Sequence, residues 1–69
     1  RLEDAEKLYA GLLAEDPSAL HLWPERIACL FAMDRREEAL AAKHEALERI
    51  AKDSREWQGV RDRIERLGQ

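Results

Sequence analysis

The chain contains few of the residues that build disulfides, phosphate-binding loops or membrane spans. Its 69 residues include one cysteine and three glycines, and the glycines are scattered at positions 11, 59 and 68. A single cysteine cannot close an internal disulfide, and scattered glycines cannot form the loop that cradles a phosphate. No apolar run approaches the roughly 20 residues of a membrane-spanning helix. We therefore expect no internal disulfide, no phosphate loop and no membrane insertion.

No group of residues typical of a metal site or a catalytic centre stands out either. His21 and His44 lie far apart, and Cys29 stands alone in an apolar stretch where a small buried side chain is expected. We therefore expect no metal and no cofactor. The only serines, Ser18 and Ser54, lie at predicted helix starts, where capping accounts for them. The sequence thus predicts no enzyme, and the lone cysteine favours the reducing cytoplasm.

The chain also lacks an excess of positive charge. Lys and Arg total 12 against 15 Asp and Glu, a net charge of −3. Domains that bind nucleic acid present a basic face, because phosphate contacts supply much of their affinity. Arginines do gather near the C-terminus, but acidic residues alternate with them, which is typical of a solvated helix face. We expect no nucleic-acid partner.

The apolar residues recur at spacings of three and four, which predicts an all-α fold. Pro24 lies in the first turn of the second predicted helix, where a missing N–H is harmless. The pairs Asp34–Glu37 and Asp53–Glu56 resemble capping boxes and predict the starts of the third and fourth helices. The four helices are expected over about residues 2–15, 22–33, 35–51 and 54–67, with short turns between antiparallel neighbours.

The predicted core consists of large apolar residues on one side of each predicted helix. They are Tyr9, Leu12, Leu13, Trp23, Ile27, Leu30, Leu40, Leu47, Ile50, Trp57 and Ile64. Trp23 and Trp57 lie on the apolar stripes of their helices, so we expect them to be structural residues rather than binding anchors.

The sequence also repeats itself with a period of 34 residues. Shifting the chain by 34 positions gives five identities among 35 aligned pairs, the most distinctive being Trp23 with Trp57. Ala5 aligns with Ala39, and Asp34 aligns with Gly68, at equivalent turns. A fixed period of this length indicates a repeat protein built from stacked helix pairs.

With this period, the sequence resembles the tetratricopeptide repeat (TPR) family, whose unit folds as two antiparallel helices. The segment Ala5-x3-Tyr9, followed by Leu12-Leu13 and Pro17, is similar to the second helix of a unit and its closing proline. The resemblance implies an α-solenoid and a single domain over residues 1–69, belonging to a longer repeat array. An unrelated helical bundle is the alternative.

The second, third and fourth predicted helices carry the rest of the resemblance. Trp23 and Trp57 are similar to the aromatic residue that opens the first helix of each unit. The segment Asp34–Leu40 resembles the turn and start of a second helix, with aspartate where glycine is usual. Lys43 stands where the family usually has an aromatic residue, so the repeats are degenerate.

The resemblance implies a non-catalytic scaffold or adaptor that binds a protein or peptide on a concave surface. The candidate partner-binding residues on the first helices are His21, Pro24, Ala28, Phe31, Arg55, Gln58, Asp62 and Glu65. The alternative function is a self-associating or docking appendage of a larger enzyme or secretion protein. In that case the last helix, with Trp57, Val60, Ile64 and Leu67 to cover, would form a homo-oligomer.

Overall fold

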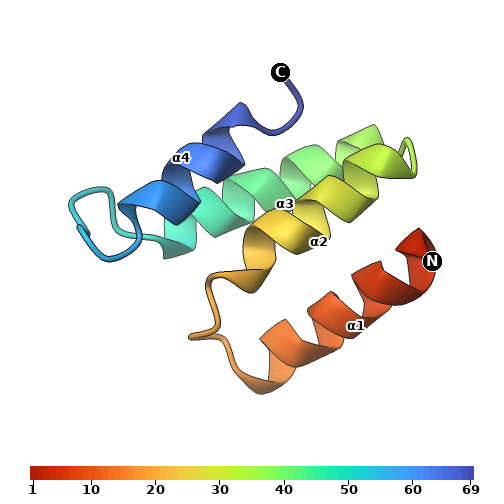
Figure 1. Cartoon of the computed structure of the whole chain (residues 1–69), viewed down its shortest axis with the longest axis horizontal. Helices are drawn as coiled ribbons and strands as arrows, with labels where there is room; N and C mark the ends of the chain where they lie inside the picture. The colour runs from red at the N-terminus through yellow and green to blue at the C-terminus, as the bar shows by residue number, and fades with distance from the viewer.

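The computed structural model describes all 69 residues and confirms an all-α fold without strands. Its helices are α1 (Leu2–Glu15), α2 (Leu22–Ala32), α3 (Arg36–Arg49) and α4 (Gln58–Arg66), arranged as shown in Figure 1. None of these helices has both the length and the apolar character needed to cross a bilayer.

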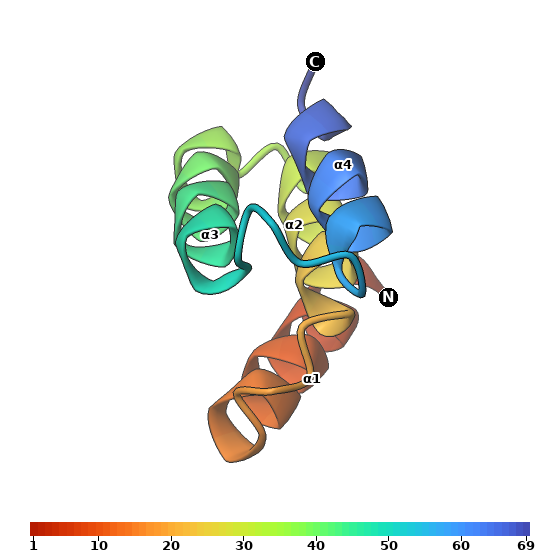
Figure 2. The ribbon, with the colours of Figure 1, turned by 90° about the vertical axis from the view of Figure 1, so that its left-hand side faces the viewer.

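The four helices do not all contact one another. α2 is the central helix, because α1, α3 and α4 each pack against it. α4 also packs against α3, whereas α1 touches neither α3 nor α4. Figure 2 shows the consequence: α1 extends away from the group formed by the other three helices. One side of α1 and the space between α1 and α3 are therefore open.

The helix boundaries agree with the sequence for α1 and differ most at α4, which begins at Gln58 instead of residue 54. The expected capping boxes do not form, since neither α3 nor α4 has a side-chain hydrogen bond at its N-cap. Ser54 instead accepts a hydrogen bond from the Trp57 N–H, at 3.4 Å between Oγ and N. This contact caps the turn of residues 55–57 that leads into α4.

Asp34 ends α2 rather than starting α3. Its φ of 61° is left-handed, and the Arg35 N–H donates to the Leu30 carbonyl at 2.9 Å. The Asp34 N–H donates to the Phe31 carbonyl at 3.0 Å. These two bonds are the pattern of a Schellman motif, in which glycine usually occupies the left-handed position. Asp34 therefore terminates the helix where the sequence suggested a cap for the next one.

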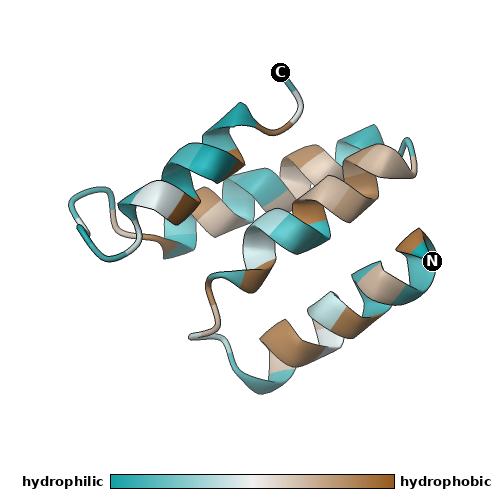
Figure 3. Ribbon diagram, viewed as in Figure 1, coloured by the Kyte–Doolittle hydropathy of each residue, from teal (hydrophilic) through white to brown (hydrophobic).

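The core joins α2 to parts of each of the other helices. It consists of Leu13, Trp23, Ile27, Leu30, Ala39, Ala42, Ala46, Ile50 and Ile64. Leu47 and Trp57, both expected in the core, are partly buried and pack against this cluster. Tyr9 on α1 is also partly buried. Hydrophilic residues predominate along α4, whereas α1 and α2 carry several hydrophobic segments (Figure 3).

Leu12 and Leu40 lie outside the core, contrary to the expectation from the sequence. Leu12 is 39% exposed and Leu40 is 46% exposed. α3 instead packs through Ala39, Ala42 and Ala46, which are at most 5% exposed. These alanines follow a three- and four-residue spacing of their own, and their short side chains let the helices approach closely. Leu40 falls on the neighbouring side of α3.

Two basic side chains join α3 and α4. Arg61 on α4 donates from Nη1 to the carbonyls of Leu47 and Ile50, each at 2.7 Å, at the end of α3. Lys43 on α3 donates from Nζ to the carbonyls of Glu65 and Leu67, each at 2.9 Å, at the end of α4. The last carbonyls of a helix lack partners within the helix. Each helix thus caps the other.

Candidate functional site

A groove runs between α1 and α3, with α2 at its base. It exists because both helices pack on α2 without touching each other. It contains two adjoining hollows, of about 290 Å³ and about 340 Å³. The first is lined by Glu6, Arg26, Leu30, Arg35, Glu38, Ala41, Ala42 and Glu45, and the second by Ala10, Leu13, Ala14, Pro17, Trp23, Arg26, Glu45 and Arg49. We call these residues together the α1–α3 groove.

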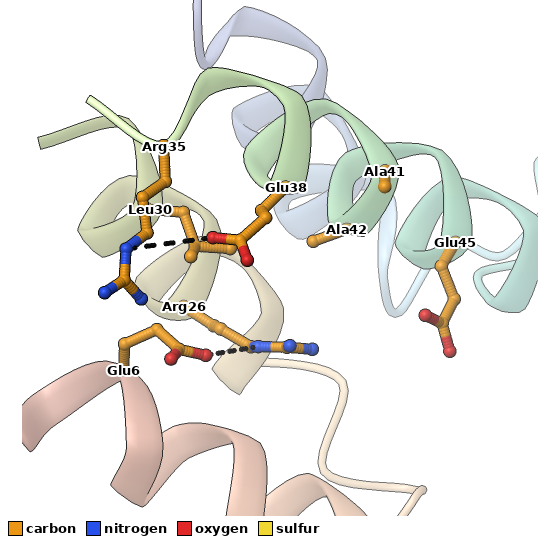
Figure 4. A pocket seen from close by; sticks show the side chains of 8 residues that line it. All are labelled: Glu6, Arg26, Leu30, Arg35, Glu38, Ala41, Ala42 and Glu45. Carbon is orange, nitrogen blue, oxygen red and sulfur yellow. Dashed lines mark hydrogen bonds and ion pairs between the residues drawn. The ribbon is translucent and has the colours of Figure 1, made fainter. Parts of the chain in front are cut away.

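An ion pair between α1 and α2 forms the middle of the groove. Arg26 Nε lies 3.0 Å from Glu6 Oε2, and the two side chains are 26% and 12% exposed (Figure 4). The Arg26 guanidinium also lies over the Trp23 ring, 5.6 Å from its centroid. The carboxylate and the indole hold the guanidinium in a defined position, because a charge this far from water requires a partner.

Glu6 is a site residue that the sequence did not reveal. A glutamate on a helix normally faces solvent, yet Glu6 is only 9% exposed. A carboxylate on a buried helix face is tolerated when a guanidinium neutralises it. The available indication was its position, seven residues before Leu13 and hence on the same side of the helix. Its partner on α2 becomes apparent only after the two helices pack.

The rim of the groove carries further ion pairs. Arg35 Nε lies 3.8 Å from Glu38 Oε2, within α3 (Figure 4). Arg49 Nη2 lies 3.0 Å from Glu45 Oε2, at the other end of the same helix. Together with the pair at its centre, the groove holds three carboxylates and three guanidiniums. The groove has no net formal charge, and both charged and apolar side chains line it.

The residues expected to line a concave binding surface lie elsewhere. His21, Arg55, Gln58, Asp62 and Glu65 are exposed, whereas Ala28 and Phe31 are only partly exposed and Pro24 is fully buried. None of the eight lines the α1–α3 groove. Pro24 cannot take part in binding, because its ring is packed inside the first turn of α2.

Of that predicted set, the structure brings only the α4 members together. Gln58 Nε2 donates to Asp62 Oδ1 at 3.1 Å, along one side of the helix. Asp62 and Glu65 line a further hollow with Arg66 and Gln69, all from the C-terminal part of the chain. No hollow combines these residues with those predicted on α2. The two halves of the predicted surface therefore do not meet in one cleft.

The remaining side chains that could bind a metal or act as nucleophiles lie apart from one another. His44 Nε2 lies 3.5 Å from Glu48 Oε1 on the exposed side of α3. Cys29 is buried and unbonded. No group of three or more His, Cys, Asp or Glu side chains lies together in an arrangement that could hold a metal ion.

Comparison of the chain with protein-family models, with curated proteins and with solved structures gives no match. A function for this chain has to be inferred from its own residues and their arrangement.

Proposed function

We propose that this chain is a non-catalytic protein-interaction module and that the α1–α3 groove is its binding site for a peptide segment. The observation that carries the proposal is the pair of adjoining hollows that α1 and α3 leave between them, because both helices pack on α2 but not on each other. The α2 residues at the base are mostly buried, so the side chains of α1 and α3 form the walls that a ligand would contact.

The chemistry of the groove suits a short apolar segment with a few polar groups. Ala10 and Ala14 line the α1 wall, and Ala41 and Ala42 line the α3 wall. Their short side chains leave room for the side chains of a ligand. Trp23 lies beneath the base and, being only 4% exposed, supports the floor of the groove rather than contacting a ligand. The surrounding ion pairs offer hydrogen-bond partners to a peptide backbone.

We further propose that the chain is a degenerate TPR module. Three features support the proposal beyond the period of 34 residues. α1 packs on α2, as α3 packs on α4. The equivalent residues Leu13 and Leu47 are buried or partly buried near these junctions, and both tryptophans contact the same core. The buried, unbonded Cys29 supports the cytoplasm as the compartment.

The alternative, self-association through the last helix, receives less support. Ile64 is fully buried, and Trp57, Val60 and Leu67 already pack against the core of the same chain. The remaining sides of α4 are mainly charged or polar. A second copy would therefore find little apolar surface on α4, and we favour the binding module.

Selection of a random peptide library on the immobilised chain tests the proposal. Enriched peptides should bind the wild type and lose affinity for an Ala14→Arg, Ala41→Arg variant, whose long side chains would occupy both hollows. Both alanines are exposed, so the fold should tolerate the change. Ala32→Arg, Ala51→Arg is the matched control, because these exposed alanines lie outside the groove. Equal binding to both variants, or no enrichment, would contradict the proposal.

A further inference from the structure

We infer that Arg26 recognises the C-terminal end of a helix of a partner protein, by donating from Nη1 and Nη2 to the carbonyls of its last turn. Arg26 lines the α1–α3 groove, and its role as the residue that determines specificity rests on the proposed function of that groove. The last four carbonyls of a helix have no partner within the helix, so they are the acceptors that such a ligand brings.

The two terminal nitrogens of Arg26 are free to bind a ligand. Its one hydrogen bond within the chain runs from Nε to Glu6, and the Nη atoms extend away from Glu6 (Figure 4). Both Nη atoms also reach solvent, because Trp23 Nε1 is the only buried side-chain nitrogen or oxygen without a partner. Since Arg26 lines both hollows, it presents two donors at the place where the hollows adjoin.

Two neighbours hold these donors in a defined position. Glu6 Oε2 accepts from Arg26 Nε at 3.0 Å, and the guanidinium lies over the Trp23 ring, 5.6 Å from its centroid. Both neighbours are themselves packed in place, since Glu6 is 9% exposed and Trp23 is 4% exposed. A side chain that is ordered before binding loses little conformational entropy when a ligand arrives. Arg26 is therefore prepared to bind.

Arg61 shows what an arginine held in this way does elsewhere in the chain. Its Nε lies 3.7 Å from Glu65 Oε1, so a glutamate again engages the Nε side of the guanidinium. Its Nη1 donates to the carbonyls of Leu47 and Ile50, three residues apart at the end of α3. The last turn of a helix brings such unpaired carbonyls together, within reach of one guanidinium. Arg26 has the same arrangement at Nε, and its Nη atoms face the groove instead of a helix end.

The charges of the groove favour carbonyls over a carboxylate as the ligand of Arg26. Glu6 already neutralises Arg26, so a ligand carboxylate would place a second negative charge beside Glu6. The two arginines of the rim are each paired with a glutamate, and they supply no excess positive charge. A helix C-terminus carries only about half a negative charge, spread over its carbonyls. It therefore suits a neutral groove that contains free donors.

The test is calorimetric titration of the whole chain with three synthetic helices of alanine, leucine and glutamine. Each has about 14 residues and an internal staple, because short helices are marginal in water. The first ends in a carboxamide and leaves its last carbonyls unpaired. The second adds a Schellman ending with glycine, which pairs those carbonyls within the peptide. The third ends in a free carboxylate. We expect micromolar binding of the first, binding of the second weaker by about tenfold or more, and no gain for the third.

Variants of the ion pair assign the preference for the first peptide to Arg26. Glu6→Gln keeps the donors of Arg26 and should keep the preference. Glu6→Gln, Arg26→Met removes the donors without leaving an unpaired buried charge, and it should bind the first and second peptides equally weakly. Arg35→Met is the matched control, since it removes another arginine of the groove and should keep the preference. Circular dichroism checks that each variant is folded. Loss of the preference, unlike loss of affinity, does not follow from a purely structural role.

Several results would overturn this role of Arg26. They are no binding of the first peptide, equal binding of the first and second by the wild type, and a preference that survives in Glu6→Gln, Arg26→Met. Binding of the third peptide tighter by about tenfold would make a carboxylate the ligand instead. The proposed function would still stand if library peptides bind the wild type and lose affinity for Ala14→Arg, Ala41→Arg. If that variant binds the first peptide normally, the peptide lies outside the groove, which contradicts both.

Discussion

Asp34 and Gly68 stand one repeat apart, and both hold a left-handed backbone at the end of a helix. Their φ angles are 61° and 84°, and Asp34 is the only residue other than glycine with a positive φ. The Phe31 ring packs against Gly68, where a Cβ would overlap it. The two endings differ in kind: Asp34 closes a Schellman motif, whereas Gly68 follows the extended Leu67 in a type II turn, in which the Gln69 N–H donates to the Arg66 carbonyl at 3.3 Å.

Replacing Asp34 with glycine should therefore stabilise the protein, by about 0.5 to 1 kcal/mol. Glycine adopts the left-handed conformation without the steric strain that a Cβ introduces. Urea unfolding followed by circular dichroism measures the change. Asp53→Gly is the control, because Asp53 has no positive φ and glycine there should not stabilise. A lower midpoint for Asp34→Gly would show that the carboxylate has a role of its own.

Arg61 should contribute more to stability than any other charged residue of α4. Arg61→Met keeps the length of the side chain but removes both hydrogen bonds to the end of α3, for an expected loss of about 2 to 4 kcal/mol. Two carbonyls would then lack their donor in a partly buried place. The exposed Arg66, changed to methionine in the same way, should be nearly neutral. Thermal unfolding of both variants compares them directly.

The Glu6–Arg26 pair should show a measurable coupling energy. A double-mutant cycle with Glu6→Gln and Arg26→Gln should give about 0.5 to 2 kcal/mol, since the pair is mostly shielded from water. The exposed Glu3–Lys7 pair, with side chains 60% and 70% exposed, should give a coupling near zero. The coupling energy of the Glu6–Arg26 pair exceeds that of the Glu3–Lys7 pair only if Glu6 and Arg26 are as buried as in this structure. A coupling equal to that of the exposed pair would place Glu6 in solvent.

The two tryptophans should differ in their effect on stability. Trp23 is 4% exposed, so Trp23→Ala should cost about 3 to 5 kcal/mol, enough to unfold a domain of this size. Trp57 is only partly buried, and Trp57→Ala should cost about half as much. Denaturant unfolding of each variant measures which substitution lowers the free energy of unfolding more. Equal losses would mean that Trp57 is more deeply packed than in this structure.

The sequence predicted the helices better than it predicted the surfaces between them. The bounds of α1 follow from its apolar spacing, and most large apolar residues of α2 are in the core as expected. The start of α4 was predicted four residues too early, since residues 55–57 form a turn capped by Ser54 and the regular helix begins only at Gln58. The eight partner-binding residues implied by the resemblance do not line one common hollow. The groove depends on Glu6 and Arg26, which no spacing rule connects across 20 residues.

By itself, the sequence determined that the chain is all helical, has four helices and repeats with a period of 34 residues. These properties are local, since they follow from the spacing of apolar residues, the positions of the prolines and the identity of each turn residue. Only the tertiary structure decided that Leu12 and Leu40 face solvent, that Glu6 is buried, and that α1 stays apart from α3. Burial depends on which helices become neighbours, and that choice depends on contacts between residues far apart in the chain.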